Sequence, residues 1–163
     1  KKRKMKVTDE MLKEAEQWND FKANKFTSKQ NSPEQQREFT VIGNLAEIAF
    51  SKKYPEAERI SNKDYDADFI IKKKRIDVKV KLGNYDFKDF YEVSVQAYQV
   101  NNNLDWYVFY HYNRKKRDLK FLGWITKEDF FKKAVFKEKG GTYNHNNIII
   151  DNNVYELEAK ELK

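Results

Sequence analysis

Acidic and basic side chains alternate with apolar residues along segment 64–81, DYDADFIIKKKRIDVKVK. In an extended strand, side chains two positions apart lie on the same face, about 6.5–7 Å from each other. Asp77 and Lys79 therefore project together from a predicted strand at 75–81, while the apolar residues between them project toward the core. Asp68 directly precedes another apolar stretch. If the two strands pair across the lysine-rich turn, an acid of the first approaches Asp77.

This combination of residue types predicts hydrolysis of phosphodiester bonds. Two carboxylates that lie close together repel each other unless a positive charge neutralises them. Mg²⁺ is suited to that position because it prefers oxygen ligands and retains several waters, and Mn²⁺ can substitute for it. A lysine beside the metal can orient or deprotonate a water and stabilise the negative charge of the transition state. We therefore expect a divalent metal as cofactor, which would lower the pKa of bound water and hold the phosphate oxygens.

The elements that must position these residues follow from periodicity and capping signals. Helices are predicted at 8–24, with Thr8 as N-cap, and at 32–54, where Ser32 and Gln35 form a capping box around Pro33. The order of two helices, a run of strands, a third helix and a hairpin predicts one α/β or α+β domain over 1–163, with 1–7 as a basic tail. The strands are expected at 57–61, 67–71, 75–81, 90–95, 105–112 and 119–125, the third helix at 126–141 and the hairpin at 147–158.

The motif DADFII at 66–71, followed by IDVKV at 76–80, resembles the core of the PD-(D/E)xK nuclease superfamily. In that family an acid opens one strand, and an acid-x-lysine lies on the next. The likeness covers roughly 32–112 and implies the restriction-endonuclease-like fold, a central mixed sheet flanked by helices. It also implies an endonuclease acting on DNA, structure-specific or of the kind found in phages and mobile elements. The chain lacks the proline of the family's name, which leaves the choice between Asp66 and Asp68 open; we favour Asp68.

The resemblance also implies a set of metal ligands. Asp68 and Asp77 would hold one or two Mg²⁺ ions, together with the backbone carbonyl of Val78. Many members carry a glutamate on the preceding helix, where this chain has Glu47 at the edge of the apolar stripe. Glu47 would bind the metal directly or through water, and Gly43, one turn earlier, would let the backbone come close beside it.

Two further residues complete the site that the resemblance implies. Lys79 would position the attacking water and stabilise the pentacovalent phosphate. Many members carry a glutamine shortly after the lysine strand, and here Gln96 is the first choice and Gln99 the second. This glutamine would fix the substrate or the lysine.

The charge balance favours a polyanionic partner. The chain has 33 Lys and Arg against 26 Asp and Glu, a net charge of +7. Basic runs next to predicted strands are either solvated loop cations or contacts to the backbone of a nucleic acid, most simply DNA. The residues expected to make these contacts are Lys72, Lys73, Lys74, Arg75, Lys81, Arg114, Lys115, Lys116 and Arg117.

Other classes of function are disfavoured. Cysteine is absent and the two histidines, His111 and His145, are 34 positions apart, so a zinc site is not expected. No apolar run approaches the roughly 18 residues of a membrane span. We therefore expect an intracellular protein without membrane contact, and a homodimer if both strands of a duplex are cut. The alternatives are a nucleic-acid-binding module that keeps the fold without cleaving, and an unrelated basic protein whose acids are surface residues.

Overall fold

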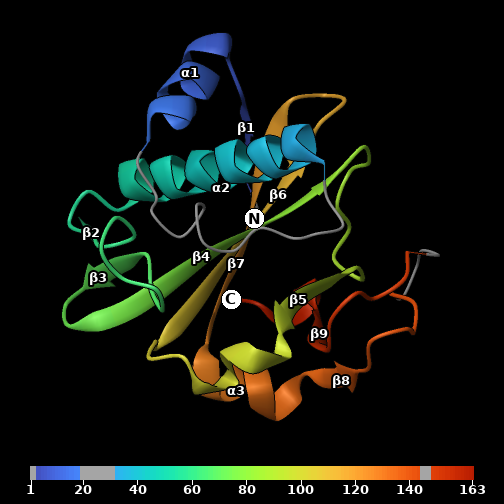
Figure 1. Cartoon of the computed structure of the whole chain (residues 1–163). Coiled ribbons are helices and arrows are strands. Elements are labelled where there is room, and N and C mark those ends of the chain that lie inside the picture. The colour runs from blue at the N-terminus through green and yellow to red at the C-terminus, as the bar shows by residue number, and fades with distance from the viewer. Residues whose placement is uncertain (1–2, 19–31, 144–147) are drawn as a thin grey trace.

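A computed structural model describes residues 3–18, 32–143 and 148–163. Its main feature is a six-stranded mixed sheet in the order β1-β7-β6-β4-β3-β2, accompanied by a three-stranded antiparallel sheet, β5-β9-β8 (Figure 1). The elements in chain order are β1 (Lys4–Lys6), α1 (Asp9–Gln17), α2 (Pro33–Lys53), β2 (Glu58–Arg59), β3 (Phe69–Ile71), β4 (Lys74–Gly83), β5 (Glu92–Gln96), η2 (Ala97–Asn101), β6 (Trp106–Asn113), β7 (Asp118–Thr126), α3 (Lys127–Lys133), β8 (Val135–Lys137), β9 (Val154–Glu158) and η3 (Ala159–Glu161).

The predicted helix starts are confirmed. The Ser32 hydroxyl accepts from the Gln35 N–H, and the Gln35 side chain accepts from the Ser32 N–H, at 3.2 and 2.9 Å. This capping box satisfies donors that α2 would otherwise leave without partners. Thr8 caps α1 through the Met11 N–H at 3.2 Å. The part of the first predicted helix beyond residue 18 lies outside the described residues.

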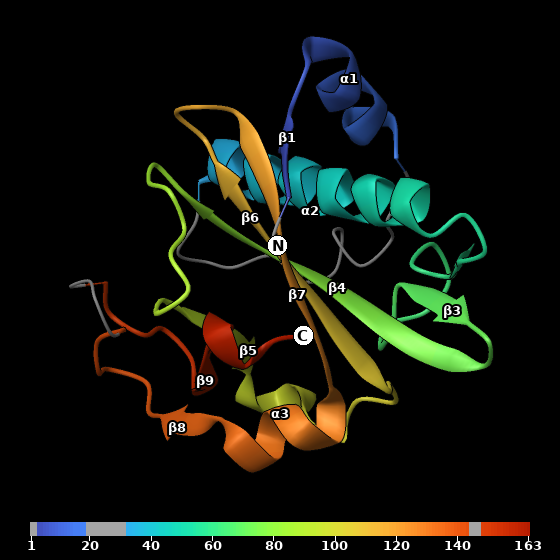
Figure 2. The ribbon, with the colours of Figure 1, turned by 180° about the vertical axis from the view of Figure 1, so that it is seen from behind.

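Two layers cover the six-stranded sheet. α2 crosses one face, and the small sheet with α3 lies against the other, as Figures 1 and 2 show from opposite sides. The α2 face is sealed by an apolar cluster that includes Leu45, Phe50 and Phe69. The second face is sealed by a separate cluster that includes Tyr107 and Phe130. The α/β class predicted from the sequence is therefore confirmed, and among the described residues no helix is both long and apolar enough to cross a bilayer.

β4 is the strand around which the large sheet is organised. It pairs antiparallel with β3 and parallel with β6. Ile76, Val78 and Val80 belong to the cluster beneath α2. Because successive side chains alternate, Asp77 and Lys79 point to the face covered by the second layer. Each of the six predicted strands from 57–61 to 119–125 overlaps a strand of the structure.

The N-terminal segment differs from the prediction of a basic tail over 1–7. Lys4–Lys6 forms β1, which pairs antiparallel with β7 and sets Met5 opposite Leu119. Val7 is buried, and its N–H donates to the carbonyl of Arg117. Apolar residues at alternate positions among the lysines thus anchor the segment to the sheet edge.

The C-terminal third also differs in detail. α3 ends at Lys133, well before the predicted end at 141, and the β-branched and aromatic residues that follow form β8. The predicted hairpin within 147–158 is wrong. Its second half, β9, pairs with β5 and β8, whereas in the described part of its first half Ile149 makes only an isolated bridge to Thr142.

Gly43 lies in the interior of α2, where a Cβ atom would meet no described atom within 4 Å. The interpretation of this glycine as a point of close backbone approach is therefore wrong. We expect Gly43→Ala to raise the free energy of unfolding by about 0.5–1 kcal/mol, because alanine loses less backbone entropy in a helix. Urea denaturation followed by circular dichroism measures the change. A lower midpoint at an unchanged slope would contradict it.

Candidate active site

An ion pair joins the two residues that the sequence places together on β4. Lys79 Nζ lies 3.0 Å from Asp77 Oδ2, and the two side chains are 20% and 10% exposed. Because β4 is hydrogen-bonded to a strand on each side, the backbone beneath the pair is held in place. The pair is therefore preorganised and largely shielded from bulk water. In such a shielded position its charges act more strongly than they would on an open surface.

Tyr107 lies beside this pair on the neighbouring strand. The parallel register sets Tyr107 next to Asp77, and Lys79 Nζ is 5.7 Å from the centroid of the Tyr107 ring. Burial and, to a lesser extent, the charge of Asp77 raise the pKa of Tyr107 well above its usual value. The hydroxyl oxygen is buried and has no hydrogen-bond partner among the described residues. It therefore remains a neutral donor next to a carboxylate.

A cavity of about 160 Å³ opens over the ion pair. Its lining comprises Tyr65, Asp66, Asp77, Lys79, Tyr98, Gln99 and Asn102. Asp66 comes from the loop before β3 and Gln99 from η2, so two separate segments converge on β4. The Gln99 Oε1 atom is buried without a hydrogen-bond partner in the described parts of the chain. The cavity thus collects two carboxylates, one ammonium group and an unused amide oxygen.

Asp68 stands at the start of β3 and is fully covered. Phe69 pairs with Ile76 in the antiparallel register of β3 and β4. One residue further along, this register sets Asp68 opposite Asp77. Its Oδ2 accepts the N–H of Val78 at 2.8 Å, and its backbone N–H donates to the carbonyl of Ile76 at 2.8 Å. Asp68 is thus bonded to the backbone between Asp77 and Lys79. Of the two candidates for the first acid, Asp66 lines the cavity and Asp68 anchors the strand.

Glu47 is buried on α2, which packs on the face opposite to the ion pair. Its Oε1 lies 3.9 Å from Arg59 Nε, and the Arg59 guanidinium lies 4.2 Å from the ring centroid of Trp18. Glu47 does not line the cavity that Asp77 and Lys79 share. The structure therefore does not place Glu47 beside Asp77 and Lys79, where the family resemblance predicted it.

Of the two glutamines, the second choice lies at the cavity. Gln96 is the last residue of β5, and it is not part of the cavity lining. The chain then turns into η2, which carries Gln99 to a position over Asp77 and Lys79. A 3₁₀ turn separates the two glutamines, and the family resemblance, which ranked Gln96 first, gave no information on this turn.

The donor set is compatible with a hard divalent cation. Within the described ranges no three His, Cys, Asp or Glu side chains are grouped so as to hold a metal. Mg²⁺, however, is commonly held by one or two carboxylates, with waters and substrate phosphates completing its shell. Asp66, Asp77 and the Gln99 amide oxygen are oxygen donors of this kind around one cavity. The residues therefore fit Mg²⁺ as a partly hydrated ion. Val78, on the strand between Asp77 and Lys79, donates its N–H to Asp68.

The basic run 114–117 lies away from this cavity. Asn113 pairs with Gly83, six residues along β4 from Asp77, which corresponds to about 20 Å. Three of the four cations form ion pairs within the chain. These are Arg114 with Glu38 at 2.7 Å, Lys116 with Asp86 at 2.6 Å and Arg117 with Asp9 at 2.8 Å. Lys115 is exposed. The structure does not bring this run to the site.

The run 72–75 divides into two parts. Arg75 is partly buried and binds both carboxylate oxygens of Asp64 at 2.9 and 2.8 Å, so it stabilises the fold instead of facing solvent. Lys72, Lys73 and Lys74 are exposed in and beside the β3–β4 turn. Lys74 is three residues from Asp77, or about 10 Å.

Lys81 is a further predicted nucleic-acid contact that the structure encloses. Its Nζ donates to the carbonyl of Glu92 at 2.8 Å, in the space between the two sheets. Burial lowers the pKa of Lys81, although the nearby charges of Glu156 and Glu92 oppose this shift. The Lys81 ammonium group thus forms a hydrogen bond within the protein and does not extend into solvent toward a nucleic acid.

Comparisons with known proteins add no further assignment. No protein-family model matches the chain, and no curated protein matches its sequence. The functional evidence is therefore the arrangement of the side chains themselves.

We expect Asp68→Ala to lower the free energy of unfolding by about 1–3 kcal/mol, because the Val78 N–H would lose its acceptor in a covered position. Asp66→Ala removes an acceptor for the exposed Asn103 N–H and should cost less than about 1 kcal/mol. Urea denaturation of both variants measures the difference. Equal losses would show that the two acids do not differ in their structural role.

His111 is buried in β6 between the rings of Tyr85 and Phe87. Burial, together with the charges of Lys81 and Lys120, lowers the pKa of His111 to about 4. Between the unfolded value near 6.5 and this folded value, the unfolded chain binds more protons. The free energy of unfolding therefore falls as pH falls through this window, by up to about 3 kcal/mol.

We expect His111→Phe to remove this part of the acid destabilisation while keeping an aromatic ring in the same space. Thermal or urea unfolding at several pH values between 7 and 4 measures it. An identical pH dependence in both proteins would contradict the assignment.

Proposed function

We propose that the chain is a divalent-metal-dependent nuclease of the restriction-endonuclease-like fold, which hydrolyses phosphodiester bonds in DNA. The observation that carries this proposal is the Asp77–Lys79 pair, 3.0 Å apart on the central strand and facing a cavity that also contains Asp66. Carboxylate, ammonium and space for a substrate group are thus present at one point.

The arrangement of the elements supports the same proposal. α2 precedes β2, β3 and β4, and the large sheet is mixed, with helices in the layers on its two faces. Asp68 opens β3, and Asp77 and Lys79 lie on the adjacent antiparallel strand. This is the order of acid and acid-x-lysine in the family that the sequence resembles.

Each side chain at the cavity has a role in such a reaction. Asp77, with Asp66, would hold Mg²⁺, which supplies a bound water of lowered pKa and neutralises phosphate oxygens. Lys79 places a positive charge where negative charge develops on the phosphate. Tyr107 can donate a hydrogen bond from its neutral hydroxyl, and Gln99 can orient a water or phosphate group. Asp68 acts as a positioning residue through the Val78 N–H.

Tyr65 and Tyr98 extend the cavity toward solvent. Both rings are exposed, and both belong to its lining. Exposed aromatic rings beside a phosphate site can stack on nucleotide bases without sequence preference. They therefore support a polynucleotide substrate over a small phosphate ester.

One observation favours a second candidate, a nucleic-acid-binding module of the same fold that does not cleave. Glu47 does not line the cavity, and no three-acid group is formed by the described residues. The retained Asp77–Lys79 pair is the argument for the enzyme, since a module that only binds does not need it.

We expect purified protein to cleave at least one member of a panel of plasmid, linear duplex DNA, single-stranded DNA and RNA with Mg²⁺ or Mn²⁺, and none with EDTA. Asp77→Asn and Lys79→Met should each lower the rate by at least about 100-fold, because each removes a charge used in the transition state. Gel electrophoresis of the products measures both effects.

The matched control is a surface pair of the same type. Glu158 and Lys160 are 3.1 Å apart and more exposed, so Glu158→Gln and Lys160→Met should leave the rate unchanged. Salt-sensitive binding with no cleavage of any substrate would favour the binding module. Cleavage that survives both substitutions on β4 would overturn the assignment of the site.

A further inference from the structure

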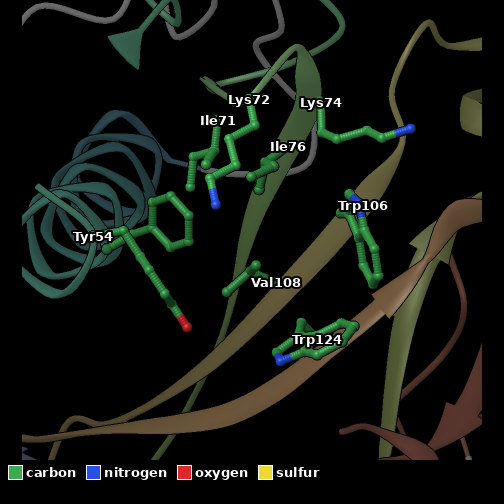
Figure 3. A pocket seen from close by; sticks show the side chains of 9 residues that line it. Tyr54, Ile71, Lys72, Lys74, Ile76, Trp106, Val108 and Trp124 are labelled. Carbon is green, nitrogen blue, oxygen red and sulfur yellow. The ribbon is translucent and has the colours of Figure 1, made fainter. Parts of the chain in front are cut away.

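A second cavity, of about 260 Å³, lies on the opposite face of the six-stranded sheet from the proposed active site. Figure 3 shows the side chains that line it. It is bounded by α2, the β3–β4 hairpin and the adjoining parts of β6 and β7. Ile76 and Val108, whose side chains belong to the cluster beneath α2, form part of its wall. Nothing in the proposed reaction uses this cavity.

Four aromatic residues also line this cavity. Trp106 and Trp124 contact each other with ring centroids 4.5 Å apart, at 69°. Phe50 and Tyr54 on α2 have centroids 4.9 Å apart. Figure 3 shows Tyr54 on one side of the cavity, with Trp106 and Trp124 on the other. Flat apolar groups can therefore be contacted from two sides.

Cations border the same cavity. Lys72 and Lys74 belong to its lining, and both are exposed. Neither forms an ion pair with another described residue, in contrast to most cations of run 114–117. Lys163 Nζ lies 5.6 Å from the ring centroid of Trp124. The apolar cavity thus has a positively charged border without a compensating acid at the turn.

The backbone of the turn gives an independent reason to regard these lysines as functional. Lys72 and Lys73 connect β3 to β4, with φ of 48° and 68°. Two-residue hairpin turns with positive φ at both positions strongly favour Asn-Gly or similar pairs. Lysine at both positions is less favourable for this backbone conformation, and it places two positive charges at the tip of the hairpin. Such unfavourable backbone conformations are typical of ligand-contacting segments.

We propose that this cavity takes the base of an unpaired nucleotide, whose neighbouring phosphates contact Lys72, Lys73 and Lys74. Aromatic side chains next to a cationic track are the usual platform for single-stranded nucleic acid. The proposal rests on the proposed nuclease function and narrows its substrate to nucleic acids with a single-stranded segment. Because Lys74 is about 10 Å along β4 from Asp77, a strand held at the turn can continue to the active-site face.

Binding is tested on the full chain in EDTA, so that no cleavage occurs. The probes are a fluorescent oligothymidylate and an abasic phosphodiester of the same length and charge, followed by anisotropy. Trp106→Leu should weaken binding of the oligothymidylate about tenfold and leave binding of the abasic probe unchanged. The double variant Lys72→Gln/Lys74→Gln should weaken binding of both probes and reduce the dependence of affinity on salt.

The matched control is the double variant Lys132→Gln/Lys133→Gln, which removes the same charge from exposed positions on α3. It should change affinity less than twofold. Equal affinity for the two probes in the native protein, or equal effects of the two lysine variants, would overturn the proposal. If Trp106→Leu does not fold, the lysine comparison still decides.

The binding assay in EDTA, read together with the cleavage panel in Mg²⁺ or Mn²⁺, separates this inference from the nuclease proposal. Base-dependent binding with no cleavage of any substrate would leave the cavity assignment standing and remove the enzyme. Cleavage with unaltered binding by the lysine variants would remove only the cavity assignment. The intrinsic fluorescence of the tryptophans gives a further measurement. If laurate, an apolar carboxylate, changes this fluorescence and the oligonucleotide does not, the cavity takes a lipid-like anion and the proposal is overturned.

Discussion

The alternation of side chains along β4 separates the molecule into two chemically different halves. Its apolar positions, such as Val78 and Val80, complete the core under α2. The intervening positions carry Asp77, Lys79 and Lys81 into the space between the two sheets. Because one backbone serves both faces, the burial that holds the strand under α2 also fixes the charged groups on the other side. A shift of the register by one residue would exchange the two faces and remove the core and the site together.

The second layer explains how so many charged groups are tolerated close to the interior. Lys79 is paired with Asp77, and Lys81 is hydrogen-bonded to a backbone carbonyl near two glutamates. Unpaired charges in such positions would be costly, whereas paired ones are stable and act strongly on a ligand. Asp68 does not line the cavity, and its bond to Val78 holds the backbone between Asp77 and Lys79. Structural and chemical roles are therefore divided between neighbouring acids.

Sequence patterns predicted the parts of this arrangement that depend on local physics. The capping box located α2, and strand alternation placed Asp77 and Lys79 on one face. The position of Tyr107 beside Asp77 and Lys79 depends on the parallel pairing of β4 with β6, which periodicity does not specify. An aromatic strand at 105–112 was the only signal that could have pointed to it.

Tertiary contacts set the positions of other candidate residues in ways that the local pattern does not specify. Glu47 was placed at the edge of an apolar stripe, but every residue from 44 to 50 is buried. The helix lies between the sheet and α1, and Asn44 Nδ2 donates to the carbonyls of Ala15 and Trp18. With two covered sides, the apolar stripe no longer indicates which side faces a site. The family resemblance ranked Gln96 before Gln99, and it gave no information on the 3₁₀ turn that carries Gln99 to the cavity.

The two edges of the large sheet have a consequence for self-association. One edge is β1, three residues long with lysine at both ends, and the other is β2, a Glu-Arg pair of residues. Short, charged edge strands offer few unpaired backbone groups to an incoming strand and repel a like neighbour. A second copy of the chain is therefore poorly placed to prolong the six-stranded sheet through either of these edge strands.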